Sequence, residues 1–252
     1  MSKIRNAVTG SLAMVMASWG FSVQADNHED GAKGAPIEFW SCNFRDGKDM
    51  GDLDKAIDAY NAWADKNNDS QVAWVMTPVF YGPENTIDVA WLGAWPDGNA
   101  WGKFQDAFDA SAGKVFEGFM EVVSCNAHEM ATSLGINAPE DPPQDGLVLF
   151  SRCTVAEGKT PDDAVAAHRQ LSAKMGGKTG ANSWLFFPGS GSSQQGSAYQ
   201  YWQVLGFDNH TELGAAWEMY TNGGGWKTAN ATLSAAARCG DTTTWRARRV
   251  TN

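Results

Sequence analysis

The segment FWSCNF at residues 39–44 returns as FSRCTV at residues 150–155, which is 111 positions later. The same features follow each segment in the same order: a Gly-Lys pair, an acidic helix start, a run that opens on Trp and closes on Pro, a Leu-Gly pair, a second helical stretch and a Cys. The spacing of apolar residues switches between that of strands and that of helices in the same order in both halves. This pattern indicates two copies of one unit. Each copy is expected to fold as strand, helix, strand, strand, helix, strand.

The expected helices have recognisable starts and ends. Asp49 and Thr160 each stand three residues before an acid, which is the spacing of a capping box. The second helix is expected over residues 100–122, and its counterpart is expected to begin near Thr211 and to break at the three glycines of residues 223–225.

The sequence also predicts the boundaries of the chain's parts. NAPEDPPQDG at residues 137–146 joins the copies and is rich in Pro and acids, as is typical of a linker. We expect a signal peptide at 1–25, a disordered tail at 26–35, repeats at 36–136 and 147–252, and the linker between them.

The first 25 residues predict export. They have a basic start, an apolar stretch and a small-x-small ending at Ala25, after which cleavage is expected. No later run is long and apolar enough for a membrane span, so we expect no membrane insertion and a periplasmic or secreted protein. Removing this leader takes away Lys3 and Arg5, so that 17 basic residues face 29 acids, a net charge of −12. Nucleic acid is therefore not an expected partner.

The four cysteines fall at matching places in the two copies. Cys42 and Cys125 bracket the first copy, and Cys153 and Cys239 bracket the second, with separations of 83 and 86 residues. An even set of cysteines in an exported protein is typical of structural disulfides rather than of a metal site. We predict disulfides Cys42–Cys125 and Cys153–Cys239, and no metal site.

The element order of each copy is that of the ferredoxin-like motif, in which the first and last strands are antiparallel neighbours. That arrangement brings each predicted cysteine pair together. The two helices cover one face of such a sheet, and the other face needs a second sheet. We therefore predict an α+β fold in which two ferredoxin-like repeats pack sheet to sheet.

On these features the chain resembles the dimeric α+β barrel superfamily, which includes antibiotic biosynthesis monooxygenase-like and stress-responsive barrel proteins. It looks like a single-chain fusion of the usual dimer, so the resemblance implies two tandem ferredoxin-like repeats packed sheet to sheet as an intramolecular dimeric α+β barrel. The resemblance implies that haem-degrading members use an Asn on the first strand, a Trp, and an axial His on the second helix. Asn43 and either Trp95 or Trp101 match the first two, but residues 100–122 contain no His. We expect no cofactor, and the cofactor-independent monooxygenases of the superfamily remain compatible with the sequence.

Strand alternation predicts which polar residues share a face. With the first cysteines paired, Ser41 is expected opposite Asn126 and Phe39 opposite His128. If Trp40, Cys42 and Phe44 pack under the helices, the space between the sheets receives Ser41, Asn43, Asn126 and His128. In the second copy the same face is expected to hold Phe150, Arg152, Thr154, Thr242, Thr244 and Arg246. The reverse assignment of faces is the alternative.

This space is our predicted ligand site. Its expected walls are the aromatic residues Trp91, Trp95, Tyr201 and Trp202, and its expected polar groups are Ser41, Asn126 and Arg152. The predicted ligand is a small apolar or aromatic molecule bound between the two halves. His128, with Asn43, is the candidate for acid–base catalysis, because imidazole titrates near neutral pH.

Three classes of function remain open at this point: a small-molecule binder, a cofactor-independent monooxygenase or isomerase, and a noncatalytic interaction module. The polar residues named above would in the last case only satisfy one another. Of the other histidines, His168 is expected in the core and His210 at a helix start. The sequence makes no prediction of oligomeric state.

Overall fold

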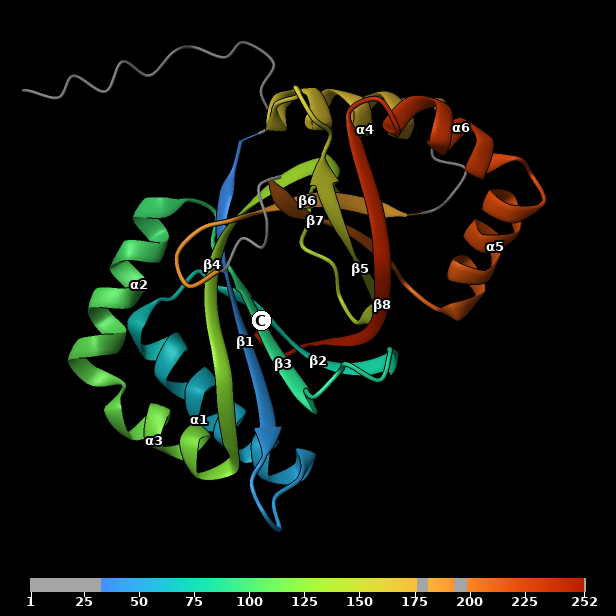
Figure 1. Ribbon diagram of the computed structural model, residues 1–252. Helices are drawn as coiled ribbons and strands as arrows, with labels where there is room; N and C mark the ends of the chain where they lie inside the picture. The colour runs from blue at the N-terminus through green and yellow to red at the C-terminus, as the bar shows by residue number, and fades with distance from the viewer. Residues whose placement is uncertain (1–32, 176–180, 193–198, 252) are drawn as a thin grey trace, which may run out of the picture. The chain divides into compact units, whose positions relative to one another are not determined.

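The computed structural model describes residues 33–175, 181–192 and 199–251 (Figure 1). The predicted signal peptide and most of the predicted tail lie outside these residues. The last residue of that tail, Ala35, already belongs to a strand. Within the described part, no helix combines the length and the apolar character that a membrane span requires.

The elements follow the predicted order in both halves, with each second helix divided into two. The first half contains β1 (Ala35–Phe44), α1 (Met50–Asn67), β2 (Val72–Phe80), β3 (Val89–Ala94), α2 (Gly98–Ser111), α3 (Gly113–Val122) and β4 (Val123–Asn137). The second half contains β5 (Gly146–Val155), α4 (Pro161–Met175), β6 (Asn182–Pro188), β7 (Gln200–Phe207), α5 (His210–Thr221), α6 (Gly225–Leu233) and β8 (Ala237–Arg249).

The helix starts are capped as predicted. The Asp49 carboxylate accepts hydrogen bonds from the backbone N–H groups of Gly51 and Asp52. At the start of α4, Thr160 and Asp163 exchange the two hydrogen bonds of a capping box. The glycines expected to break the last helix separate α5 from α6, where Gly224 takes a φ of 78° that other residues seldom adopt.

The strands of the described residues close into a barrel in the order β1-β3-β2-β8-β5-β7-β6-β4. Each half contributes a four-stranded sheet of ferredoxin-like order, and the halves join through antiparallel pairing of β2 with β8 and of β4 with β6. This closure agrees with the predicted α+β barrel, and it adds pairing between the sheet edges, which the sequence prediction did not specify. The physical reason is that closure pairs the N–H and C=O groups that edge strands would leave open.

The barrel has an apolar interior and a helical exterior. Helices α1, α2 and α3 cover the outside of the first-half strands, and α4, α5 and α6 cover those of the second half (Figure 1). The interior is filled by side chains from both halves, which include Ile37, Met76, Phe150, Phe186 and Trp245. Inward and outward positions therefore form two distinct environments along every strand.

Both predicted disulfides are confirmed. Cys42 is bonded to Cys125 and Cys153 to Cys239, with Cα–Cα distances of 3.9 Å and 4.0 Å. Each disulfide joins the first and last strands of one half. The antiparallel arrangement of these strands is the one expected from the sequence.

A β-bulge beside each disulfide corrects the predicted faces. Cys42 lies opposite Cys125, but Ser41 lies opposite Ala127, so Asn126 is an extra residue. His128 consequently faces the helices and lies opposite Trp40, whereas the regular register had placed it inside the barrel. One inserted residue reverses the direction of every side chain beyond it.

The same correction applies to the second half. The bulge there inserts Asp241, and Thr242 pairs with Ser151 on the helix-covered face. Thr244 and Arg246 follow on that face, opposite Leu149 and Leu147. The predicted inward-facing residues on β5 keep their expected face. These residues are Phe150, Arg152 and Thr154.

Candidate functional site

A pocket of about 120 Å³ lies between the first-half sheet and the helices α2 and α3. We call it the helix-side pocket. Its walls are mainly aromatic, and the rings that line it are Trp40, Tyr60, Trp91, Phe104, Phe108, Phe116 and Phe119. Among its few polar lining residues are Glu38, Gln71, Gln105 and His128.

Glu38 places a carboxylate in this apolar setting. It stands on β1 on the same face as Trp40 and is only 6% exposed. Its Oε1 accepts hydrogen bonds from Trp101 Nε1 at 2.6 Å and from Gln105 Nε2, and its Oε2 faces His128 Nε2 at 3.1 Å. Hydrogen bonds of this kind stabilise a buried carboxylate in its charged form. Trp101 and Gln105 both come from α2, so this helix fixes the position of Glu38.

His128 lies at the edge of the pocket, and its side chain is 45% exposed. Its ring stacks on Trp40, with centroids 3.6 Å apart and planes inclined by 16°. Since a carboxylate can only accept, Nε2 is the donor in the hydrogen bond to Glu38, and in the neutral imidazole the lone pair then lies on Nδ1. Among the described residues Nδ1 has no hydrogen-bond partner, so it is the basic nitrogen of the site.

The wall of the pocket also carries a neutral hydroxyl. Tyr60 Oη lies 3.1 Å from Asp69 Oδ2 and is also hydrogen-bonded to Gln71. Burial, and then the nearby Asp69 carboxylate, raise the pKa of Tyr60 well above its usual range. Burial also raises the pKa of Asp69. The Tyr60 hydroxyl therefore keeps its proton at neutral pH, and it belongs to the wall of the pocket.

The predicted aromatic walls mostly lie outside the barrel interior. Trp91 packs against Tyr60 and Phe119 beneath the helices, where it lines the helix-side pocket. Trp95 is 2% exposed in the core under α2. Tyr201 lies under α4, hydrogen-bonded to His168 at 2.9 Å. These positions correct the prediction for Trp91 and Tyr201, whereas Trp95 also lines a cavity at the end of the barrel.

The predicted polar residues are not brought together. Asn43 Oδ1 accepts from the backbone N–H of Asp88 at 3.1 Å, on the face of β1 opposite to that of Trp40 and His128. Asn126 is exposed in its bulge, and Ser41 is buried between neighbouring strands. Arg152 is exposed and stacks over Trp202, which lies 5.2 Å from its guanidinium. Of the two proposed catalytic residues, His128 lines the helix-side pocket and Asn43 does not.

Sequence reasoning missed Glu38, although a signal for it exists. In the run PIEFWSC of residues 36–42, alternation places Glu38 with Trp40 and Cys42. A carboxylate on a face expected to lie under helices is rare unless it has partners. The two partners from α2, Trp101 and Gln105, lie more than 60 positions away, at separations of 63 and 67 residues, and no local pattern reveals them.

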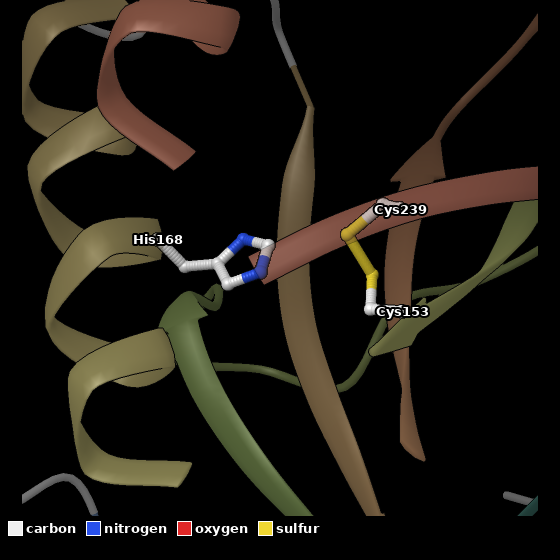
Figure 2. A group of neighbouring side chains, drawn as sticks. All are labelled: Cys153, His168 and Cys239. Atoms are coloured by element: carbon white, nitrogen blue, oxygen red, sulfur yellow. A yellow bond between two sulfur atoms is a disulfide. The ribbon is translucent and has the colours of Figure 1, made fainter. Parts of the chain in front are cut away.

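Cys153, His168 and Cys239 form the one group of three metal-ligating residue types within the described part of the chain. Figure 2 shows His168 extending from α4 toward the disulfide between the two cysteines. Because the sulfurs are bonded to each other, they are not thiolates and do not form a metal site. His168 is only 3% exposed, which confirms the predicted core position.

Comparison with known proteins gives a likeness of fold. No protein-family model and no curated protein matches the chain. A heme-bound variant of DypB from Rhodococcus jostii RHA1 has a TM-score of 0.50 at 6% identity, covering 85% of this chain and 93% of that chain. A mutant chlorite dismutase from Candidatus Nitrospira defluvii has a TM-score of 0.49 at 8% identity, covering 85% and 90%. An anthrone oxidase-like protein has a TM-score of 0.43 at 13% identity, covering 88% of this chain and 96% of that chain.

The DypB likeness agrees with the predicted α+β barrel class and shows the fold alone. That DypB variant is in complex with heme, so we asked whether the helix-side pocket fits heme, and it does not. At about 120 Å³ the pocket is too small for a tetrapyrrole. The helices that cover it, α2 and α3, contain no His, and Nε2 of His128 is occupied by Glu38.

His168 gives a testable dependence of stability on pH. Burial lowers its pKa to about 4, whereas an unfolded chain binds this proton below about pH 6.5. Stability is therefore complete above pH 6.5 and falls as the pH drops to 4, by about 3 kcal/mol in total from this residue. In urea unfolding, H168Q is expected to lack this part of the decrease, and H210Q is the exposed control. Equal pH slopes for H168Q and the wild type would contradict the assignment.

Proposed function

We propose that this protein binds a small aromatic molecule in the helix-side pocket and catalyses proton transfer on it, with His128 as the base. The observation that carries the proposal is the pairing of a buried carboxylate with an imidazole at the edge of an aromatic pocket. Perturbed or paired titratable groups beside an apolar cavity are the usual sign of such a site. The proposed site thus lies beneath the helices of the first half, instead of between the halves.

The size of the pocket limits the ligand. An engineered apolar cavity of about 150 Å³ holds benzene, so a pocket of about 120 Å³ suits a single ring with a small polar substituent. The ring would stack among Trp91, Phe116 and Phe119, and its polar group would reach His128 at the exposed edge. Phenols and aryl ketones fit this description.

The proposed chemistry uses only groups of the chain. His128 Nδ1 takes a proton from the ligand, and the imidazolium that forms is stabilised by the Glu38 carboxylate 3.1 Å from Nε2. The imidazolium then returns the proton to another atom of the ligand, which completes an isomerisation. Glu38 orients the ring and fixes its tautomer throughout, as the third group of a catalytic triad does.

The test is hydrogen exchange on acetophenone, a single-ring ketone with exchangeable methyl protons. We expect the protein in D2O to replace these protons faster than an equal concentration of free imidazole does, as followed by proton NMR. Phenol in excess should inhibit the exchange. Binding of acetophenone without exchange would support a noncatalytic binder, and uptake of O2 with the ligand would support the monooxygenase alternative. Neither binding nor exchange would reject the proposal.

We propose in addition that residues 1–25 are a cleaved signal peptide and that the mature protein is periplasmic or secreted. The two disulfides support this, because they persist in oxidising compartments. We also propose that the halves, residues 36–136 and 147–252, are tandem copies of one barrel subunit joined by residues 137–146. Their matching disulfides and bulges support the duplication. The mass of the protein isolated from its source would test cleavage after Ala25.

A further inference from the structure

A second cavity, of about 370 Å³, lies at the end of the barrel where β5 begins and β8 ends. We call it the barrel-end cavity. Its walls come from both halves, with Trp74 and Leu92 from the first and Trp184, Phe186 and Val204 from the second. Small-molecule sites have volumes of about 300 to 1,000 Å³ and mainly apolar walls. This cavity meets both criteria.

The connection between β4 and β5 forms one side of this cavity through residues 139–145. Trp74 Nε1 donates a hydrogen bond to the Pro143 carbonyl at 3.1 Å, and the Arg249 backbone N–H donates to Asp145 Oδ1 at 2.8 Å. Prolines in the connection restrict its backbone further. Since Trp74 is itself a wall residue, wall and connection are fixed to each other. A cavity held in this way needs little ordering when a ligand enters.

The charges of the cavity have one sign. Its charged lining residues are Glu140, Asp141, Asp145 and Asp208, all of them exposed at the rim, and no described lining residue is Lys, Arg or His. Asp145 accepts only from the backbone N–H of Arg249, and the guanidinium of Arg249 donates to the Pro142 carbonyl at 3.5 Å. Glu140 and Asp141 make no hydrogen bond or ion pair with described residues, so their charges stay open to a ligand. A rim of this kind attracts a cationic group and repels an anionic one.

We propose that the barrel-end cavity is a second ligand site, specific for an aromatic amine. The ring inserts among Trp74, Trp184 and Phe186, and the ammonium group remains at the rim beside Glu140 and Asp141. The two pockets share no lining residue, so this proposal is independent of the proposed function.

The test compares three ligands that share a naphthalene ring: 1-naphthylmethylamine, 1-naphthylmethanol and 1-naphthoic acid. Calorimetric titration of the full chain at pH 7 and low salt should give binding of the amine at least about ten-fold tighter than that of the acid, with the alcohol between them. Added salt should narrow this difference. Equal binding of acid and amine, or no binding of either amine or alcohol, would overturn the proposal.

Two kinds of variant locate the binding. Ala94→Phe fills the cavity and should weaken amine binding at least ten-fold, while Ala110→Phe on the exposed surface of α2 is the matched control. If Ala94→Phe does not fold, Val148→Phe fills the cavity from the second half. The double variant E140Q/D141N should remove the preference for the amine and leave the affinity for the alcohol unchanged. Amine binding that survives the filling variants would place it elsewhere and reject the site.

Discussion

The double variant C153A/C239A is expected to lose about 4 kcal/mol of its free energy of unfolding, measured by urea denaturation at pH 7. The disulfide closes a loop of 86 residues, and its removal returns to the unfolded chain the conformational freedom that this loop had lost. Cys153 is fully buried, so alanine is the replacement that avoids an unpaired polar group there.

The first disulfide provides the matched comparison. Its loop of 83 residues is almost the same length, so C42A/C125A should lose nearly the same free energy. The quadruple variant should then be unstable at ambient temperature, because natural domains have only about 5–15 kcal/mol to lose. A loss below about 1 kcal/mol in either double variant would show that loop closure is not what these bonds contribute.

H128A is expected to lower the rate of acetophenone exchange by a factor of about 10² to 10⁴, which is the usual contribution of a general base. His128 is 45% exposed, so the fold should tolerate its truncation. H210A, which removes an exposed imidazole at the start of α5, is the control and should exchange at the wild-type rate. Equal rates in both variants would exclude His128 as the base.

E38Q separates positioning from chemistry. The amide has the shape of the carboxylate but cannot stabilise an imidazolium or accept from every donor that now surrounds Glu38. We expect exchange to fall about ten-fold while the affinity for phenol stays at the wild-type value, because the imidazolium formed in the reaction loses its counter-charge. A purely structural role for Glu38 would lower stability but leave the exchange rate of the folded variant unchanged.

Much of the fold could be predicted because its signals are local. The spacing of apolar residues marks the strands and helices, Asp49 and Thr160 mark helix starts, and the two cysteine pairs fix which strands are neighbours. Each of these signals either lies within a few neighbouring residues or occurs again at the matching place in the second half. The disulfides were predictable for the same reason, since matching positions in two similar segments leave one simple pairing.

The site depended on features that alternation does not reveal. The bulges insert Asn126 and Asp241 into otherwise regular strands, and each single insertion moves the residues beyond it to the other face. This is why His128 was expected inside the barrel and lies outside it. The barrel class was predicted, but the strand pairs that close it, β2 with β8 and β4 with β6, were not, because they join segments that are distant in the chain. The partners of Glu38 are equally distant in sequence.

The most direct test of the account is a crystal structure of the protein with phenol bound. We expect the ring between Trp91 and Phe119 in the helix-side pocket, with its hydroxyl within hydrogen-bond distance of His128 Nδ1 and the Glu38–His128 contact preserved. Phenol bound only in the barrel-end cavity, or with its hydroxyl turned away from His128 toward Tyr60, would contradict the assignment of His128 as the base.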